Sequence, residues 1–221
     1  MTQDDIKAIA ARVISIEVDA LHQMAGVLLS DFAGAVEAIL QIKGRMIVSR
    51  VGKFGHIGNK IAATLTSTGT SASFVHATEA SHGDLGMVTA ADFCLLISNS
   101  GETSELRDLV AHTRRLGIPM AAILSRADST LMQAADYKLT LTHAPEACSI
   151  GMAPTTSTTL TLALGDALAV VLMEWRDFQP EGFKVLHPDN APCDGPNMIQ
   201  IDDMPALIVH LRAFDALRKG L

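Results

Sequence analysis

The sequence predicts an α/β protein whose parallel sheet is covered by helices on both faces. From residue 46 onward, short apolar runs alternate with helix-like stretches, the pattern of repeated strand–helix units. The length of 221 residues suits one such domain with terminal extensions. In a parallel sheet of this kind, ligands bind beyond the carboxyl ends of the strands, so we expect the chemistry in the loops that follow them.

Each element is predicted from its own pattern. Residues 4–42 carry apolar side chains three to four positions apart, which indicates one or two amphipathic helices. The predicted strands are 46–49, 71–76, 93–98, 119–124 and 137–142, and the predicted helices are 56–68, 103–116, 128–135 and 155–176.

The end of the chain has a different composition. Residues 178–202 are rich in Pro, Gly and Asp and are predicted to form a loop or an extended arm. Apolar spacing then predicts a last amphipathic helix over 203–219, with Asp203 as its N-cap. We therefore expect one domain over residues 1–190, including the N-terminal helix, and an arm with a helix over 191–221.

Composition excludes several classes of protein. The net charge is −7 and the 17 basic residues are scattered, so nucleic acid is not an expected partner. The three cysteines are odd in number and lack CxxC spacing, which argues against disulfides and zinc and favours a reducing cytoplasm. No signal peptide is recognisable and no apolar run approaches the roughly 20 residues of a membrane span, so we expect neither export nor membrane insertion.

Three loops could bind an anion. In "VGKFGHIG" the glycines follow a GxxGxxG spacing that differs from nucleotide fingerprints, but Lys53 lies where a strand ends and a helix begins. A lysine there can meet an anion, although a solvated lysine in a tight turn explains this loop equally well. Gly52 and Gly55 would let the backbone approach the ligand.

The other two loops are rich in hydroxyl groups. In "SNSGETSEL", the hydroxyls of Ser98, Ser100, Thr103 and Ser104 surround Gly101 and could enclose a monophosphate. The alternative, which this loop taken alone favours, is an ordinary capping box with Glu102 or Glu105 in the first helical turn. Residues 155–159 are five consecutive Ser or Thr residues that open an apolar helix. Capping explains about two of them, and a ligand could explain more.

Titratable side chains complete the set of candidates. His82, Glu146 and His187 lie in predicted loops beside small residues, where a side chain can face a cleft, although a lone loop histidine is more often solvated. No HExxH or paired-Cys spacing occurs, so no metal is expected.

Taken together, these motifs resemble a known family. "GKFGHIGNK", "SHGDLG", "SNSGETSE" and "EACSIGMAPTTSTTLTLALGDALAV" are similar to the sugar isomerase (SIS) domain of arabinose-5-phosphate isomerases, over residues 40–190. The resemblance implies a three-layer αβα sandwich with a five-stranded parallel sheet, assembled as a tetramer. It also implies the cytoplasmic interconversion of ribulose 5-phosphate and arabinose 5-phosphate through an enediolate, toward Kdo and lipopolysaccharide, without metal or organic cofactor.

The resemblance also carries over site residues. The family's catalytic lysine, two histidines and two acids fall on Lys53, His82, His187, Glu105 and Glu146. We favour Glu146 over Glu105 as the base, with the histidines moving protons at oxygen and Lys53 stabilising negative charge. The expected substrate and phosphate contacts are Gly52, Ser67, Ser98, Asn99, Ser100, Thr103, Thr155 and Ser157.

Some positions depart from the family pattern. Arg50 and Phe54 replace small residues in the first loop, and Leu186, Asp189 and Asn190 alter the surroundings of His187. Many relatives continue into paired CBS domains, which we do not expect here. Two alternatives therefore stay open: a non-catalytic SIS module that binds a sugar phosphate in a regulatory role, and an isomerase for another phosphosugar.

Overall fold

The computed structural model describes residues 1–27 and 30–187. The chain divides into two compact units, Met1–Phe178 and a second that begins at Gln179. The predicted helix over 203–219, its N-cap Asp203, and the departures at Asp189 and Asn190 lie outside the described residues. The division into residues 1–190 and 191–221 therefore stays a prediction.

Five parallel strands form a single sheet in the first unit. They are β1 (Met46–Arg50), β2 (Ala72–His76), β3 (Phe93–Ile97), β4 (Met120–Leu124) and β5 (Tyr137–Thr140). Their order across the sheet is β2-β1-β3-β4-β5, and every neighbouring pair is parallel. This confirms the predicted five-stranded sheet, and each strand agrees with its predicted range to within two residues.

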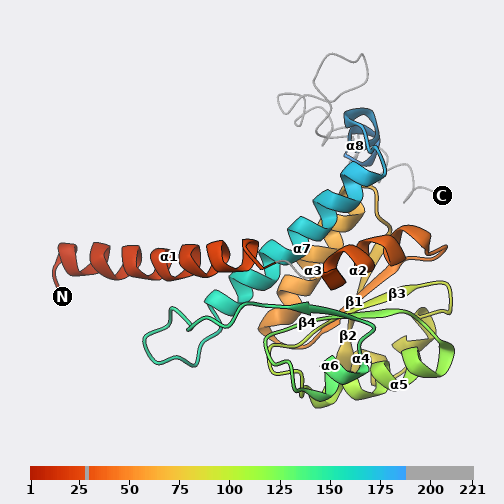
Figure 1. The fold of residues 1–221 in the computed structure, drawn as a ribbon, viewed down its shortest axis with the longest axis horizontal. Helices are drawn as coiled ribbons and strands as arrows, with labels where there is room; N and C mark the ends of the chain where they lie inside the picture. Colours follow the sequence, from red (N-terminus) through yellow and green to blue (C-terminus); the bar gives the residue numbers. More distant parts are fainter. Residues whose placement is uncertain (28–29, 188–221) are drawn as a thin grey trace, which may run out of the picture. The chain divides into compact units, whose positions relative to one another are not determined.

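Helices cover both faces of this sheet (Figure 1). On one face lie α2 (Ser30–Gln41), α3 (Lys53–Ser67) and α7 (Thr156–Trp175), and on the other α4 (Ala77–Ser81), α5 (Arg107–Leu116) and α6 (Thr130–Ala134), with the short 3₁₀ turns η1 (Asp84–Met87) and η2 (Ser104–Leu106). Because strand side chains alternate between faces, Val48 and Leu95 join the first core cluster while Ile47 and Leu96 join the second. The fold is the expected three-layer αβα sandwich.

Several boundaries differ from the prediction. Helix α3 begins at Lys53, three residues early, so the lysine is inside the first helical turn and not before it. The N-terminal segment, predicted as one or two helices, forms two, α2 and the longer α1 (Gln3–Ala25). The predicted loop over 178–202 is wrong at its start, because α8 (Pro180–Leu186) occupies it. Pro180 explains the error: its fixed φ and missing N–H suit the first position of a helix.

Helix α7 corrects the expectation that no apolar segment is long enough to span a membrane. It is 20 residues long, and an 18-residue segment within it has a mean hydropathy of 1.5, so the helix passes that test by length and composition. Half of this segment is buried in the protein, with Leu160, Leu164, Leu168 and Leu172 packed in the first core cluster. Its apolar character is thus that of a core helix in contact with α3.

Candidate functional site

The strand order places a topological switch point between β1 and β3. The chain leaves β1 through α3 toward β2, and leaves β3 through α5 toward β4, so the two connections diverge from adjacent strands. In open α/β sheets with this order, the crevice for ligands lies outside the carboxyl ends of those strands. The residues that follow β1 and β3 are therefore the first to consider.

The loop after β3 is folded by its own hydroxyl groups. The Ser98 Oγ atom is buried, accepts a hydrogen bond from the Gly101 N–H at 2.9 Å and lies 2.8 Å from Thr103 Oγ1. Gly101 adopts a φ of 71°, a conformation that favours glycine. Ser100 is exposed and accepts from the Glu102 N–H at 3.3 Å.

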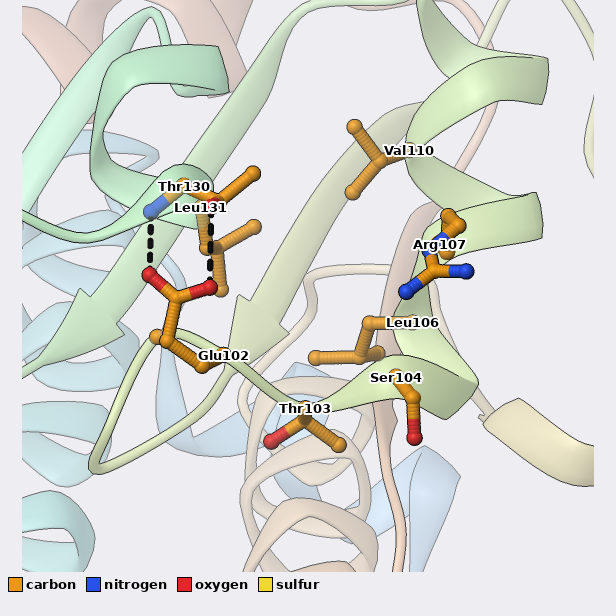
Figure 2. A pocket seen from close by; sticks show the side chains of 9 residues that line it. Glu102, Thr103, Ser104, Leu106, Arg107, Val110, Thr130 and Leu131 are labelled. Atoms are coloured by element: carbon orange, nitrogen blue, oxygen red, sulfur yellow. Dashed lines mark hydrogen bonds between the residues drawn. The ribbon is translucent and has the colours of Figure 1, made fainter.

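The capping alternative allowed Glu102 to lie in a first helical turn without a partner, but its carboxylate has hydrogen-bond partners in another segment. Its carboxylate accepts hydrogen bonds from the Thr130 N–H at 2.7 Å and from Thr130 Oγ1 at 2.8 Å, and these bonds lower its pKa (Figure 2). The pair ties the loop after β3 to the start of α6. A small cavity between this loop, α5 and α6 is lined by Thr103, Ser104 and Arg107 among others (Figure 2).

Two cationic residues lie at the carboxyl end of β1. Arg50, the last residue of the strand, donates a hydrogen bond to Thr103 Oγ1 across the switch point. Its guanidinium carbon lies 5.2 Å from the centroid of the Phe54 ring, a cation–π contact. Lys53 is exposed in the first turn of α3, and Gly52 before it has a φ of 65°. The helix N-terminus adds a partial positive charge at this place.

A cavity of about 400 Å³ opens beside the loop, at the carboxyl ends of β3, β4 and β5. Volumes of this size hold small-molecule ligands. Four predicted site residues line it: Asn99, Ser100, Glu146 and Ser157. The structure therefore brings together residues from the second and third loops that are about 50 positions apart in the sequence.

Glu146 is held rigidly at the edge of this cavity by the start of α7. One carboxylate oxygen accepts from the Thr155 N–H at 2.7 Å, Thr155 Oγ1 at 3.1 Å and the Ser157 N–H at 3.3 Å, and the other accepts from Ser157 Oγ. Burial alone would raise the pKa of Glu146, but these hydrogen bonds outweigh it and lower the pKa. The side chain is thus a stable carboxylate that also caps α7.

This arrangement conflicts with the prediction that Thr155 binds phosphate. Thr155 Oγ1 donates to Glu146 and accepts from the N–H groups of Ala147 and Cys148, which uses the full capacity of one hydroxyl. The neighbouring hydroxyls of Thr156 and Thr158 also bond to the protein backbone. Hydrogen bonds within the protein therefore account for more of residues 155–159 than the two that capping was expected to explain. Ser157 still lines the cavity.

Three further predicted residues of the first unit line neither of the two cavities. Ser67 is the last residue of α3, about 20 Å along the helix from Lys53. It therefore lies near the amino ends of the strands, and not at their carboxyl ends. His82 is exposed after α4 on the β2 side of the sheet. Glu105 is exposed, bonded to the Ser104 hydroxyl at 2.8 Å, and lines neither of these two cavities. His187 belongs to the second unit, where its ring stacks on Phe183 at 3.9 Å.

Sequence reasoning missed four polar residues of the larger cavity. They are Ser125 and Arg126 after β4, and Thr142 and His143 after β5. Ser125 Oγ donates to Asn99 Oδ1 at 2.6 Å, so one of them also orients a predicted residue. The rule that ligands bind at the carboxyl ends of parallel strands could have found all four.

Hydroxyls, cations and a fixed carboxylate at a switch point are the features of an α/β protein whose strand-end crevice suits a small anionic ligand. Among the described residues, no group of three or more His, Cys, Asp or Glu side chains is placed to hold a metal ion. The family follows from comparison with known proteins. Residues 39–171 match the SIS domain, more than half of the chain, and the chain belongs to that family.

Similar proteins refine this assignment. The chain is 48% identical over 187 residues to the arabinose 5-phosphate isomerase KdsD of Yersinia pestis, covering 85% of this chain and 57% of that protein. The same enzyme of Pseudomonas aeruginosa is 47% identical over 182 residues, with 82% and 56% covered. The chain thus spans little more than half the length of these relatives. A structure from Escherichia coli CFT073 in complex with arabinose 5-phosphate is 36% identical with a TM-score of 0.82, covering 85% of this chain and all of that one.

Proposed function

We propose that this protein is an aldose–ketose isomerase that interconverts ribulose 5-phosphate and arabinose 5-phosphate. The observation that carries the proposal is the cavity at the strand ends, where a fixed carboxylate, Glu146, faces the polar loop after β3. The KdsD relatives and the complex of a similar structure with arabinose 5-phosphate support the same reaction and the same class of ligand.

The reaction needs a base that removes a proton from the carbon next to the carbonyl, and groups that stabilise the enediolate. Glu146 is the proposed base, because it lines the cavity and is ionised at neutral pH. Lys53 supplies positive charge from the start of α3. His82 and His187 are the proposed proton carriers at the sugar oxygens on the strength of the family resemblance alone, since His82 does not line the cavity of this chain. Glu105 is the alternative base.

The phosphate of the sugar is proposed to bind at the loop after β3. Ser98 and Thr103 shape this loop, and Ser100, Asn99 and the backbone at Gly52 face the same edge of the sheet. Serine and threonine hydroxyls with backbone N–H groups bind a monophosphate well, and two nearby cations favour its charge. The proposed site thus has two ends. The phosphate lies near the cation Lys53, and the reacting carbons lie near the carboxylate of Glu146.

The proposal also covers where the protein acts and how it assembles. We expect a cytoplasmic protein that acts toward Kdo and lipopolysaccharide, in a homo-oligomer such as a tetramer. Helix α1 supports the oligomer, because only Ala20 and Met24 are buried along it while Ile6, Ile9 and Ile14 are exposed. Apolar surface of this kind is commonly covered by another subunit.

The test is incubation of the purified protein with ribulose 5-phosphate, with other ketose phosphates in parallel, followed by detection of the aldose. Formation of arabinose 5-phosphate at a rate typical of enzymes, on the order of 1 to 1000 per second, is the expected result. Turnover of a different ketose phosphate alone would change the substrate. Saturable binding without turnover of any of them would favour the regulatory SIS module.

A further inference from the structure

Arg50 is a cation that forms no close ion pair within the described residues. Its side chain is half-buried at the carboxyl end of β1, and among the described residues no carboxylate oxygen lies within 4 Å of it. Glu105 acts on it electrostatically from a greater distance. A buried charge without a paired counter-charge is costly, so such a residue commonly faces an anionic ligand.

The guanidinium is also held in place. Phe54, the second residue of α3, stacks against it, and Thr103 accepts a hydrogen bond from one terminal nitrogen. Ser98 in turn contacts Thr103, so a continuous set of side chains runs from β1 to the loop after β3. A planar cation fixed in this way loses little freedom when it binds a further group.

Part of its hydrogen-bonding capacity is unused. Among the described residues, Arg50 Nε is buried without a partner, and so is Nδ1 of His76. Arg50 and His76 are paired residues on neighbouring strands β1 and β2, so their side chains leave the same face of the sheet. Buried polar atoms are nearly always bonded, and two unpartnered nitrogens on paired residues of neighbouring strands indicate a place for an oxygen-rich ligand.

We propose that Arg50, held by Phe54 and Thr103, is a phosphate-binding residue that gives this protein its preference for phosphorylated over unphosphorylated sugars. The inference rests on the proposed function for the identity of the sugar, but not for the phosphate contact itself. Arg50 lies at the switch point where the ligand is expected, and a guanidinium matches two phosphate oxygens at once.

Calorimetric titration with inorganic phosphate, arabinose 5-phosphate and free arabinose tests the proposal in wild type, Arg50→Gln and Arg50→Lys. We expect Arg50→Gln to weaken binding of both phosphates roughly 10- to 100-fold, since a hydrogen bond to a charged group is lost, and to leave free arabinose unchanged. Arg50→Lys should restore part of the affinity, because it keeps the charge and loses the planar fork.

Arg45→Gln is the matched control. Arg45 is half-buried and donates a hydrogen bond to the Ser73 hydroxyl at 3.3 Å. It directly precedes β1 and so lies at the amino end of the strand, whereas Arg50 lies at the carboxyl end. Substitution of Arg45 should leave phosphate affinity within about threefold of wild type, the size of effect expected of a charge far from the ligand. Equal phosphate affinity in wild type and Arg50→Gln would overturn the proposal, as would an equal loss for free arabinose.

A measurement on the wild-type protein covers the case in which Arg50→Gln does not fold. The Nε–H resonance of Arg50, assigned by its absence in Arg50→Lys, should shift on titration with inorganic phosphate, and an unmoved resonance would overturn the proposal. Absence of isomerase turnover together with Arg50-dependent phosphate binding would instead reject the proposed function and leave this inference standing.

Discussion

Two hydroxyl-rich segments of this protein look alike in sequence and serve different purposes. The loop at residues 98–104 surrounds Gly101 and meets the cation Arg50, whereas residues 155–158 surround the carboxylate Glu146. A phosphate dianion is attracted to the first and repelled by the second. The charge that lies among the hydroxyls, and not their number, decides which segment can bind the phosphate and which can support proton transfer.

The largest effect is expected when the two candidate bases, Glu146 and Glu105, are neutralised one at a time. Glu146→Gln should lower the turnover number about 10²- to 10⁴-fold, the range for a lost general base, and abolish incorporation of deuterium from solvent into the sugar. Glu105→Gln should have a smaller effect, because Glu105 does not line the cavity. Glu174→Gln, an exposed change at the end of α7, is the control. Deuterium exchange that survives in Glu146→Gln would move the role of base to Glu105.

A second substitution tests whether the loop after β3 depends on the backbone conformation of Gly101. In Gly101→Ala the added Cβ would lie 2.0 Å from Ser129 Oγ, and the φ of 71° adds strain. Ser129 is buried and caps α6, so it cannot move freely. We expect a loss of about 2 to 3 kcal/mol in the free energy of unfolding, measured by urea denaturation.

Gly86→Ala provides the reference for that measurement. Its added Cβ would meet no atom within 4 Å, and its φ is not positive. A change within about 0.5 kcal/mol is expected there, as for surface substitutions in general. Equal effects of the two substitutions would show that the geometry at Gly101 is not strict.

A third pair of changes compares the same bond in two settings. Ser157→Ala removes a hydroxyl that donates to the partly buried Glu146, and about 1 to 2 kcal/mol of unfolding free energy should be lost. Ser104→Ala removes a hydroxyl that donates to the exposed Glu105, where water replaces the bond and little change is expected. Thermal unfolding of both variants distinguishes a structural carboxylate from a solvated one.

The smallest expected effect is in the pH dependence of stability. The pKa of Glu146 is lowered in the folded protein from an ordinary value of 4.5, so the unfolded chain binds its proton more readily. Its contribution is therefore fully present above about pH 4.5 and is lost as the pH falls through the folded pKa. Urea unfolding from pH 7 to pH 3 should show a stability difference between wild type and Glu146→Gln that shrinks toward low pH. A constant difference would contradict the lowered pKa.

Much of the fold could be predicted because strand and helix signals are local. All five strands follow apolar runs, and the parallel arrangement follows from their alternation with helices. The errors lie where local cues conflict: Pro and Gly residues predicted a loop at 178–202, yet Pro180 starts α8. Half of the polar residues that line the larger cavity, Asn99, Ser100, Glu146 and Ser157, were among the predicted residues, because motifs in the loops after strands pointed to them. Ser67 was grouped with them, although it lies near the amino ends of the strands.

By itself, the sequence determined the α/β architecture, the loops that carry hydroxyls, and the resemblance to the SIS domain family. Only the tertiary structure decided which charge meets which loop. Arg50 and Thr103 are 53 residues apart, and Glu102 and Thr130 are 28 apart. Such pairs depend on the order of strands in the sheet, which brings β1 beside β3 and β3 beside β4, and no pattern within either segment records that order.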